Sequence, residues 1–106
     1  MMMADVALQV WLDTQTGSGP AMVTPYVQSA TAKTVLYRVD VIKTGAGSAS
    51  HASQAGTVMA PAATPTALPR LTIDAGATDK CRIELAVGER KTAMEKHVFD
   101  CPRRTH

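Results

Sequence analysis

TVLYRVDVIK (residues 34–43) is the stretch that decides the fold class, because apolar side chains recur in it at every second position. One face holds Val35, Tyr37, Val39 and Val41, and the other holds Leu36, Arg38, Asp40 and Ile42. This period of two is typical of a β-strand with one face in a core. The second face mixes charged with apolar residues, so it fits either a binding face or a face that a loop covers.

Six further segments with strand character surround this stretch and are separated by turn residues. They cover residues 5–13, 22–28, 57–60, 71–73, 81–87 and 92–100. In the second of these, Pro25 predicts an edge strand or a bulge, because proline cannot donate to a ladder of hydrogen bonds. Seven short strands in 106 residues predict one all-β sandwich, with a partly open Greek-key barrel as the alternative.

The connections between these segments differ in composition. Residues 45–56 (GAGSASHASQAG) are small and polar, and we expect a flexible surface loop there. Residues 61–69 hold three of the six prolines and predict an irregular connection. A four-residue turn at 88–91 is expected to join the last two strands as a hairpin.

Composition excludes several classes of function. The formal net charge is +2 and the basic residues are dispersed, which argues against nucleic-acid binding. No apolar stretch is long enough to cross a bilayer, and no signal peptide is visible at the start. No nucleophile elbow, phosphate loop, paired carboxylates or metal motif is found, so we expect neither an enzyme nor a cofactor or metal site.

The two cysteines, Cys81 and Cys101, are too far apart for a CxxC motif and leave a disulfide or two inert thiols as interpretations. A simple four-residue turn would pair Val87 with Thr92 and would place Cys81 opposite Val98. Cys101 would then overshoot its partner by three residues, and a bulge or a bend in the return strand would have to absorb the offset.

The order of motifs resembles one known family. The motifs are VLYRVDVI (35–42), GAGSASHASQAG (45–56), ALPRLTI (67–73), KCRIELAV (80–87) and the terminal Cys-Pro at 101–102. In this order they resemble the periplasmic curli assembly proteins of the CsgC/CsgH family, and more closely its CsgH branch. The resemblance spans nearly the whole chain, from about residue 6 to residue 102, and rests on the order of motifs that are individually soft.

The resemblance implies a seven-stranded immunoglobulin-like β-sandwich, a single domain over residues 1–106 with an ordered core from about 5 to 102. It also implies a monomer in the periplasm that keeps curli amyloid subunits, the major or minor curlin, from polymerising before export. The CsgC branch carries a Cys-x-Cys pair where this chain has Val35 and Tyr37, so thiol–disulfide exchange at that site is impossible here. Because the periplasm is oxidising, we expect a structural Cys81–Cys101 disulfide.

An inhibitor of this kind needs weak, electrostatically steered contacts with a disordered partner. The expected partner-binding residues are basic residues on strands of one sheet, with two more at the margins. They are Arg38, Arg82 and Lys96, with Lys43 and Lys80 at the margins. Each of them has a second interpretation as an ordinary solvated charge. For the whole protein, the alternative is a generic immunoglobulin-like structural or adhesion module of a bacterial surface assembly.

Overall fold

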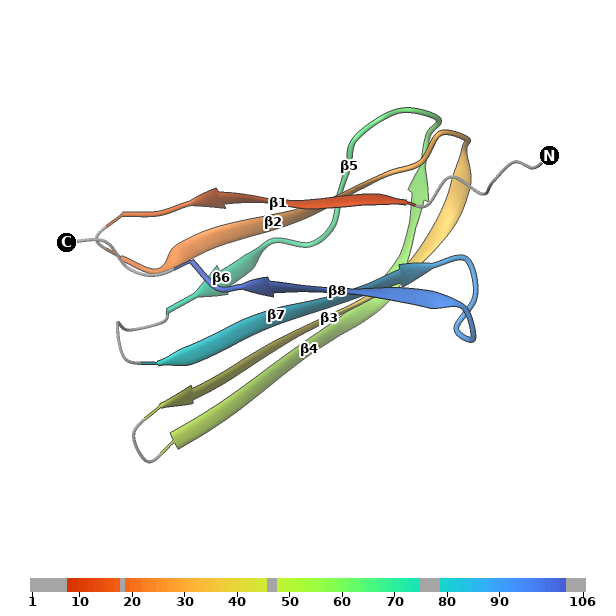
Figure 1. The fold of residues 1–106 in the computed structure, drawn as a ribbon. Helices are drawn as coiled ribbons and strands as arrows, with labels where there is room; N and C mark the ends of the chain where they lie inside the picture. The colour runs from red at the N-terminus through yellow and green to blue at the C-terminus, as the bar shows by residue number, and fades with distance from the viewer. Residues whose placement is uncertain (1–7, 18, 46–47, 75–78, 103–106) are drawn as a thin grey trace.

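The computed structural model describes residues 8–17, 19–45, 48–74 and 79–102, and its regular elements there are all strands (Figure 1). The strands are β1 (Gln9–Gln15), β2 (Ala21–Gln28), β3 (Lys33–Gly45), β4 (Ser48–Ala60), β5 (Thr66–Ala67), β6 (Leu71–Ile73), β7 (Lys80–Gly88) and β8 (Met94–Asp100). The predicted all-β class is confirmed. The described residues form eight strands instead of seven, because two residues of the proline-rich connection pair as β5.

The strands form two antiparallel sheets, which lie as two layers in Figure 1. One sheet has the order β4-β3-β7-β8; in the other, β2 pairs with β1 on one side and with β5 and β6 on the other. No helix in the described part of the chain is long and apolar enough to cross a membrane.

Alternate side chains of both sheets meet in one apolar core. The fully buried members include Val23 and Val27 of β2, Val39 of β3, and Ile83 and Leu85 of β7. The period-two pattern of β3 holds, because its predicted inward residues are the ones that are buried in this core or packed against it. Full burial of one such side chain stabilises the fold by about 1.5–3 kcal/mol, so the core is the main source of stability.

Pro25 lies in a central strand, so the predicted edge position is wrong. Its side chain is fully buried, and its carbonyl accepts a hydrogen bond of 2.8 Å from the amide of Leu68. In a strand, the N–H and C=O of one residue point to the same side, so the missing donor of Pro25 faces the side of β5 and β6. There the ladder is interrupted between Val23, paired with β6, and Tyr26, paired with β5. Proline is tolerated because no amide donor is required at that position.

The stretch 45–56, predicted to be a flexible loop, is wrongly assigned. Gly45 ends β3, and residues 48–56 belong to β4, which pairs with β3 along thirteen positions. Residues 46–47 lie outside the described part of the chain. Small side chains have weak strand preference of their own, but the long β3 supplies a complete row of hydrogen-bonding partners. The partner strand therefore overrides local propensity.

The hairpin of β7 and β8 has a longer turn than predicted. The return strand begins at Met94 instead of residue 92, and Gly88 pairs with Met94. A Cβ at Gly88 would lie 2.5 Å from the carbonyl oxygen of Ala93, so the chain can pass over this position only because it is glycine. Ala93 donates a backbone hydrogen bond of 3.0 Å to Arg90, which closes the turn.

This longer turn resolves the offset between the cysteines. The observed ladder pairs Arg82 with Asp100, so the next step brings Cys81 opposite Cys101 without a bulge. The two Cα atoms lie 5.4 Å apart and the sulfur atoms are bonded. The predicted disulfide is confirmed, whereas the predicted register, with Cys81 opposite Val98, is wrong by three residues.

The end of β1 also differs from the sequence pattern. β1 runs to Gln15, two residues beyond the predicted end, because Thr14 and Gln15 continue the ladder to Val23 and Met22. The predicted first residues of this strand, 5–7, and the tail 103–106 lie outside the described part of the chain.

Candidate functional site: a charged sheet face

The outer face of the β4-β3-β7-β8 sheet gathers charged side chains from β3, β7 and β8 and a histidine from β4. We call it the charged face and define it by Arg38, Asp40, His51, Arg82, Glu84 and Lys96. The ladders place Arg38 level with Ala86 and Lys96, and Asp40 level with Glu84. Four of the five predicted cations have the parity of this face: Arg38, Arg82 and Lys96 belong to the network, and Lys80 lies two residues before Arg82.

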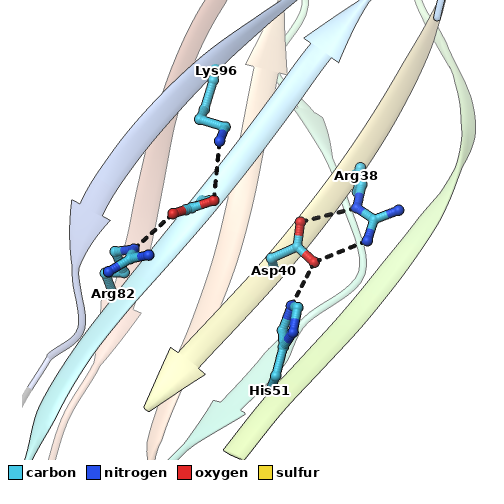
Figure 2. A network of polar contacts seen from close by, with 6 residues as sticks. Arg38, Asp40, His51, Arg82 and Lys96 are labelled. Carbon is cyan, nitrogen blue, oxygen red and sulfur yellow. Dashed lines mark hydrogen bonds and ion pairs between the residues drawn. The ribbon is translucent and has the colours of Figure 1, made fainter. Parts of the chain in front are cut away.

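Two carboxylates occupy the centre of this face and lie directly opposite each other on β3 and β7. Like charges at opposite positions of a sheet destabilise it unless cations surround them. Asp40 accepts hydrogen bonds from Arg38 Nε at 3.0 Å and lies 2.9 Å from His51 Nε2 (Figure 2). Glu84 accepts a hydrogen bond from Arg82 Nε at 2.7 Å and pairs with Lys96 Nζ at 3.2 Å.

The cations lie at the outside of the network and the carboxylates inside it. The side chains of Arg38, Arg82 and Lys96 are 57%, 54% and 61% exposed, whereas those of Asp40 and Glu84 are 14% and 17% exposed. The groups that a partner meets first are therefore positive, although each is paired with a carboxylate beneath it.

Burial and hydrogen bonding act on Asp40 in opposite directions. Burial raises the pKa of Asp40, but hydrogen bonds from Arg38, His51 and Ser53 outweigh it and lower the pKa from 3.8 to about 2. Hydrogen bonds from Arg82 and Lys96 likewise lower the pKa of Glu84. Both carboxylates remain ionised well below neutral pH, so the network keeps its alternating charges.

We expect the free energy of unfolding to fall as pH drops from about 4 towards 2. A carboxyl with a depressed folded pKa takes up its proton on unfolding, so its stabilisation is present above the unfolded pKa and is lost below it. Asp40→Asn should flatten this decline in denaturant unfolding curves recorded at several pH values. Asp13→Asn, which removes an exposed carboxylate of β1, is the control; equal slopes for Asp40→Asn and wild type would contradict the assignment.

Of the two marginal cations, Lys43 lies away from the charged face and Lys80 lies at its end. Lys43 belongs to the opposite parity of β3, and its ammonium donates a hydrogen bond of 2.8 Å to the backbone carbonyl of Asp74, beyond the end of β6. Lys80 is exposed at the start of β7, level with Thr44 at one end of the charged face. The structure thus brings Arg38, Arg82 and Lys96 together and leaves Lys43 on the side of the other sheet.

The predicted binding residues do not include Asp40, Glu84 or His51, although the strand pattern already puts Asp40 on the same face as Arg38. The sequence predicts a loop at His51, but this residue joins the network because β4 pairs it with Ile42, two residues after Asp40. The carboxylates were visible as outward residues of their strands, but their position opposite each other depends on the register between β3 and β7. Alternating Arg-x-Asp and Arg-x-Glu along both strands was the available signal.

Comparison with known protein families identifies one family whose model matches most of the chain. The model of the Tafi-CsgC family, described as thin aggregative fimbriae synthesis protein, matches residues 1–97. The chain belongs to the Tafi-CsgC family. A search of curated proteins gives no significant match.

Two solved structures have a similar fold. The curli protein CsgC of E. coli aligns with a TM-score of 0.76 at 18% identity, covering 88% of this chain and 98% of that one. The solution structure of R. palustris CsgH aligns with a TM-score of 0.69 at 18% identity, covering 89% of this chain and 92% of the other. At 18% identity these alignments show that the two proteins share their fold with the Tafi-CsgC protein described here.

The Tafi-CsgC member described here holds its two cysteines in the disulfide, and no free cysteine is found in the described residues. Val35 and Tyr37 stand at the two positions that match the Cys-x-Cys pair of the CsgC branch. Val35 is fully buried, and Tyr37 is half-buried against the core. Neither side chain can take part in thiol exchange, so the charged face is the stronger candidate for function.

Proposed function

We propose that this protein is a periplasmic, chaperone-like inhibitor that keeps curli amyloid subunits from polymerising prematurely, acting as a monomer and without catalysis. The family match over residues 1–97 is the observation that carries the proposal. The two structural neighbours, named as curli proteins, support it. We further propose that the two sheets form an immunoglobulin-like sandwich, which the common apolar core between antiparallel sheets supports.

The charged face suits transient contacts with a disordered chain. Amyloid grows by the addition of strands, and an inhibitor acting in small amounts must meet early species and release them. Exposed cations accelerate such encounters, because attraction between opposite charges raises the association rate by about tenfold or more. Carboxylates beside each cation limit the net charge, so that binding stays weak and reversible.

We expect the triple variant Arg38→Gln, Arg82→Gln, Lys96→Gln to slow association with the curli subunit by about tenfold. The reason is that it removes the exposed positive charges and keeps the carboxylates. The measurement is the lag time of subunit polymerisation, followed by thioflavin-T fluorescence at low and high salt. Added salt should weaken the wild-type effect, because exposed charges are screened beyond about 10 Å at 0.1 M.

The matched control is the double variant Asp40→Asn, Glu84→Gln, which removes the two carboxylates from the same network. Its inhibition should equal or exceed that of wild type, since the face becomes more positive. Circular dichroism checks that both variants stay folded. Equal inhibition by the two variants would reject electrostatic steering by this face, and a wild type without any effect at equal molar ratio would favour a structural or adhesion module.

A further inference from the structure

The outer edge of β4 offers a long row of backbone groups to a partner chain. In the described part of the chain, β4 pairs with β3 and with no second strand, and it forms one border of its sheet (Figure 1). The strand is thirteen residues long, and its side chains from residue 49 to residue 55 are all exposed. In an edge strand, alternate residues point their N–H and C=O groups away from the sheet, so β4 is a template for a further strand.

This edge lacks the residues that usually prevent strand addition. Soluble proteins protect sheet edges with lysine, other charged residues or proline. β4 (SASHASQAGTVMA) contains no Lys, Arg, Asp, Glu or Pro. β8, the opposite edge of the same sheet, carries Glu95, Lys96 and Asp100 in seven residues. The two edges of one sheet thus differ, and β4 is the one open to pairing.

A groove runs beside this edge, between β4 and β6 of the other sheet. Its volume is about 440 Å³. Buried Leu71 and Ile73 and half-buried Val41 give it apolar surface. Its charged lining residues are two cations, Lys43 and Arg70, and one carboxylate, Asp74, so the groove keeps a net positive charge. The hydrogen bond from Lys43 to the Asp74 carbonyl keeps its ammonium at the groove. Side chains of a strand added to β4 would enter this groove at every second position.

We propose that the β4 edge binds an extended segment of the amyloid subunit as an added antiparallel or parallel strand, with its groove-facing side chains apolar or acidic. This inference rests on the proposed function and adds the chemistry of the bound segment and its mode of contact. Main-chain hydrogen bonds supply the affinity in such strand addition, and the pockets beside the edge supply selectivity. While the segment is paired with β4, its own paired edge is not free to add to another subunit and extend a fibril.

The chemistry of the groove favours this occupant over a second copy of the chain. Pairing of two β4 strands would offer the groove only small or uncharged side chains, because its own groove-facing residues are Ser50, Ala52 and Gln54. The apolar surface from Leu71 and Ile73 and the charge of Lys43 would then lack complementary groups. A segment with alternating apolar or acidic side chains fills the volume and complements the charge.

Two matched variants on the same strand test the proposal. Ala52→Lys places a long cation in the groove, whereas Ala55→Lys places the same charge on the charged face, level with Arg38. The thioflavin-T lag of freshly desalted major curli subunit should require about tenfold more of Ala52→Lys than of wild type, because several backbone hydrogen bonds are hindered. Ala55→Lys should inhibit at least as well as wild type does, because its side chain points away from the groove and adds a cation to the charged face. Equal inhibition by both variants overturns the proposal.

Amide hydrogen exchange on the wild-type chain gives a test that does not depend on a variant folding. With the major curli subunit present, alternate amides between residues 49 and 57 should exchange about tenfold more slowly. Protection of β8 amides instead, or protection of β4 in concentrated protein alone together with dimers in ultracentrifugation, overturns the proposal. If wild type inhibits without protecting β4, only this inference fails; if wild type does not inhibit, the proposed function fails.

Discussion

Replacing Cys81 and Cys101 together by alanine is expected to lower the free energy of unfolding by about 3 kcal/mol. The disulfide joins residues twenty positions apart, and its loss frees the unfolded chain from that closed loop. The pair also fixes the ends of β7 and β8, where the amide of Cys101 donates to the carbonyl of Cys81 at 3.4 Å. Small domains have total stabilities of about 5–15 kcal/mol, so this loss is a large share.

Denaturant unfolding followed by circular dichroism measures the effect. The control is wild type after complete reduction, which keeps both sulfur atoms and lacks only the bond between them. Its two thiols are alkylated only after unfolding. This control separates the effect of losing the bond from the effect of losing the sulfur atoms. Both the reduced wild type and the double-alanine variant should unfold at lower denaturant than the oxidised wild type. Coincident curves for oxidised and reduced protein would show that the bond does not stabilise the fold.

Leu85→Ala is expected to destabilise the domain by about 3 kcal/mol. Leu85 is fully buried in the middle of β7, between Val39 of β3 and His97 of β8 in the ladder. Truncation removes apolar contact and leaves a cavity that the surrounding strands fill only in part. The measurement is the midpoint and slope of urea unfolding, compared with wild type at the same pH.

The matched control for this prediction is Val98→Thr on the neighbouring strand. Val98 is 57% exposed and lies on the opposite face of the same sheet. Threonine keeps the branched shape of valine, so the change in stability should stay within about 0.5 kcal/mol. A similar loss from both substitutions would contradict the placement of the core between the two sheets.

The strands that the sequence predicted well are those with their own pattern of alternation. The period of two in β3 and β7 predicts which residues face the core. The structure buries residues of that parity in both strands: Val35 and Val39 in β3, and Ile83, Leu85 and Val87 in β7. The same parity puts Arg38, Arg82 and Lys96 on one outer face. Local sequence suffices here, because each strand contains its own inward and outward residues.

The features that the sequence did not predict depend on partners far away in the chain. The strand β4 has small side chains without alternation, and only the register with β3 makes it a strand. Pro25 is accepted in a central strand because β5 and β6 leave a break beside it. The turn that brings Cys81 opposite Cys101 is set by the close approach of the chain to Gly88. In each case the deciding contact is long-range or sterically specific.

The composition of the charged face could be predicted only in part for the same reason. The outward direction of Asp40 and Glu84 follows from parity, but their opposition depends on which residues of β3 and β7 are paired. His51 enters the face only through β4. The cations predicted as a basic face are therefore part of a network in which each exposed cation stands beside a carboxylate.

The most direct test of the account is a thioflavin-T time course of major curli subunit with sub-stoichiometric amounts of the wild-type protein. The protein should extend the lag phase strongly and leave the subunit soluble during it, because transient contacts with early species suffice to delay the addition of strands. A lag phase that is unchanged even at equal molar ratio would contradict the account.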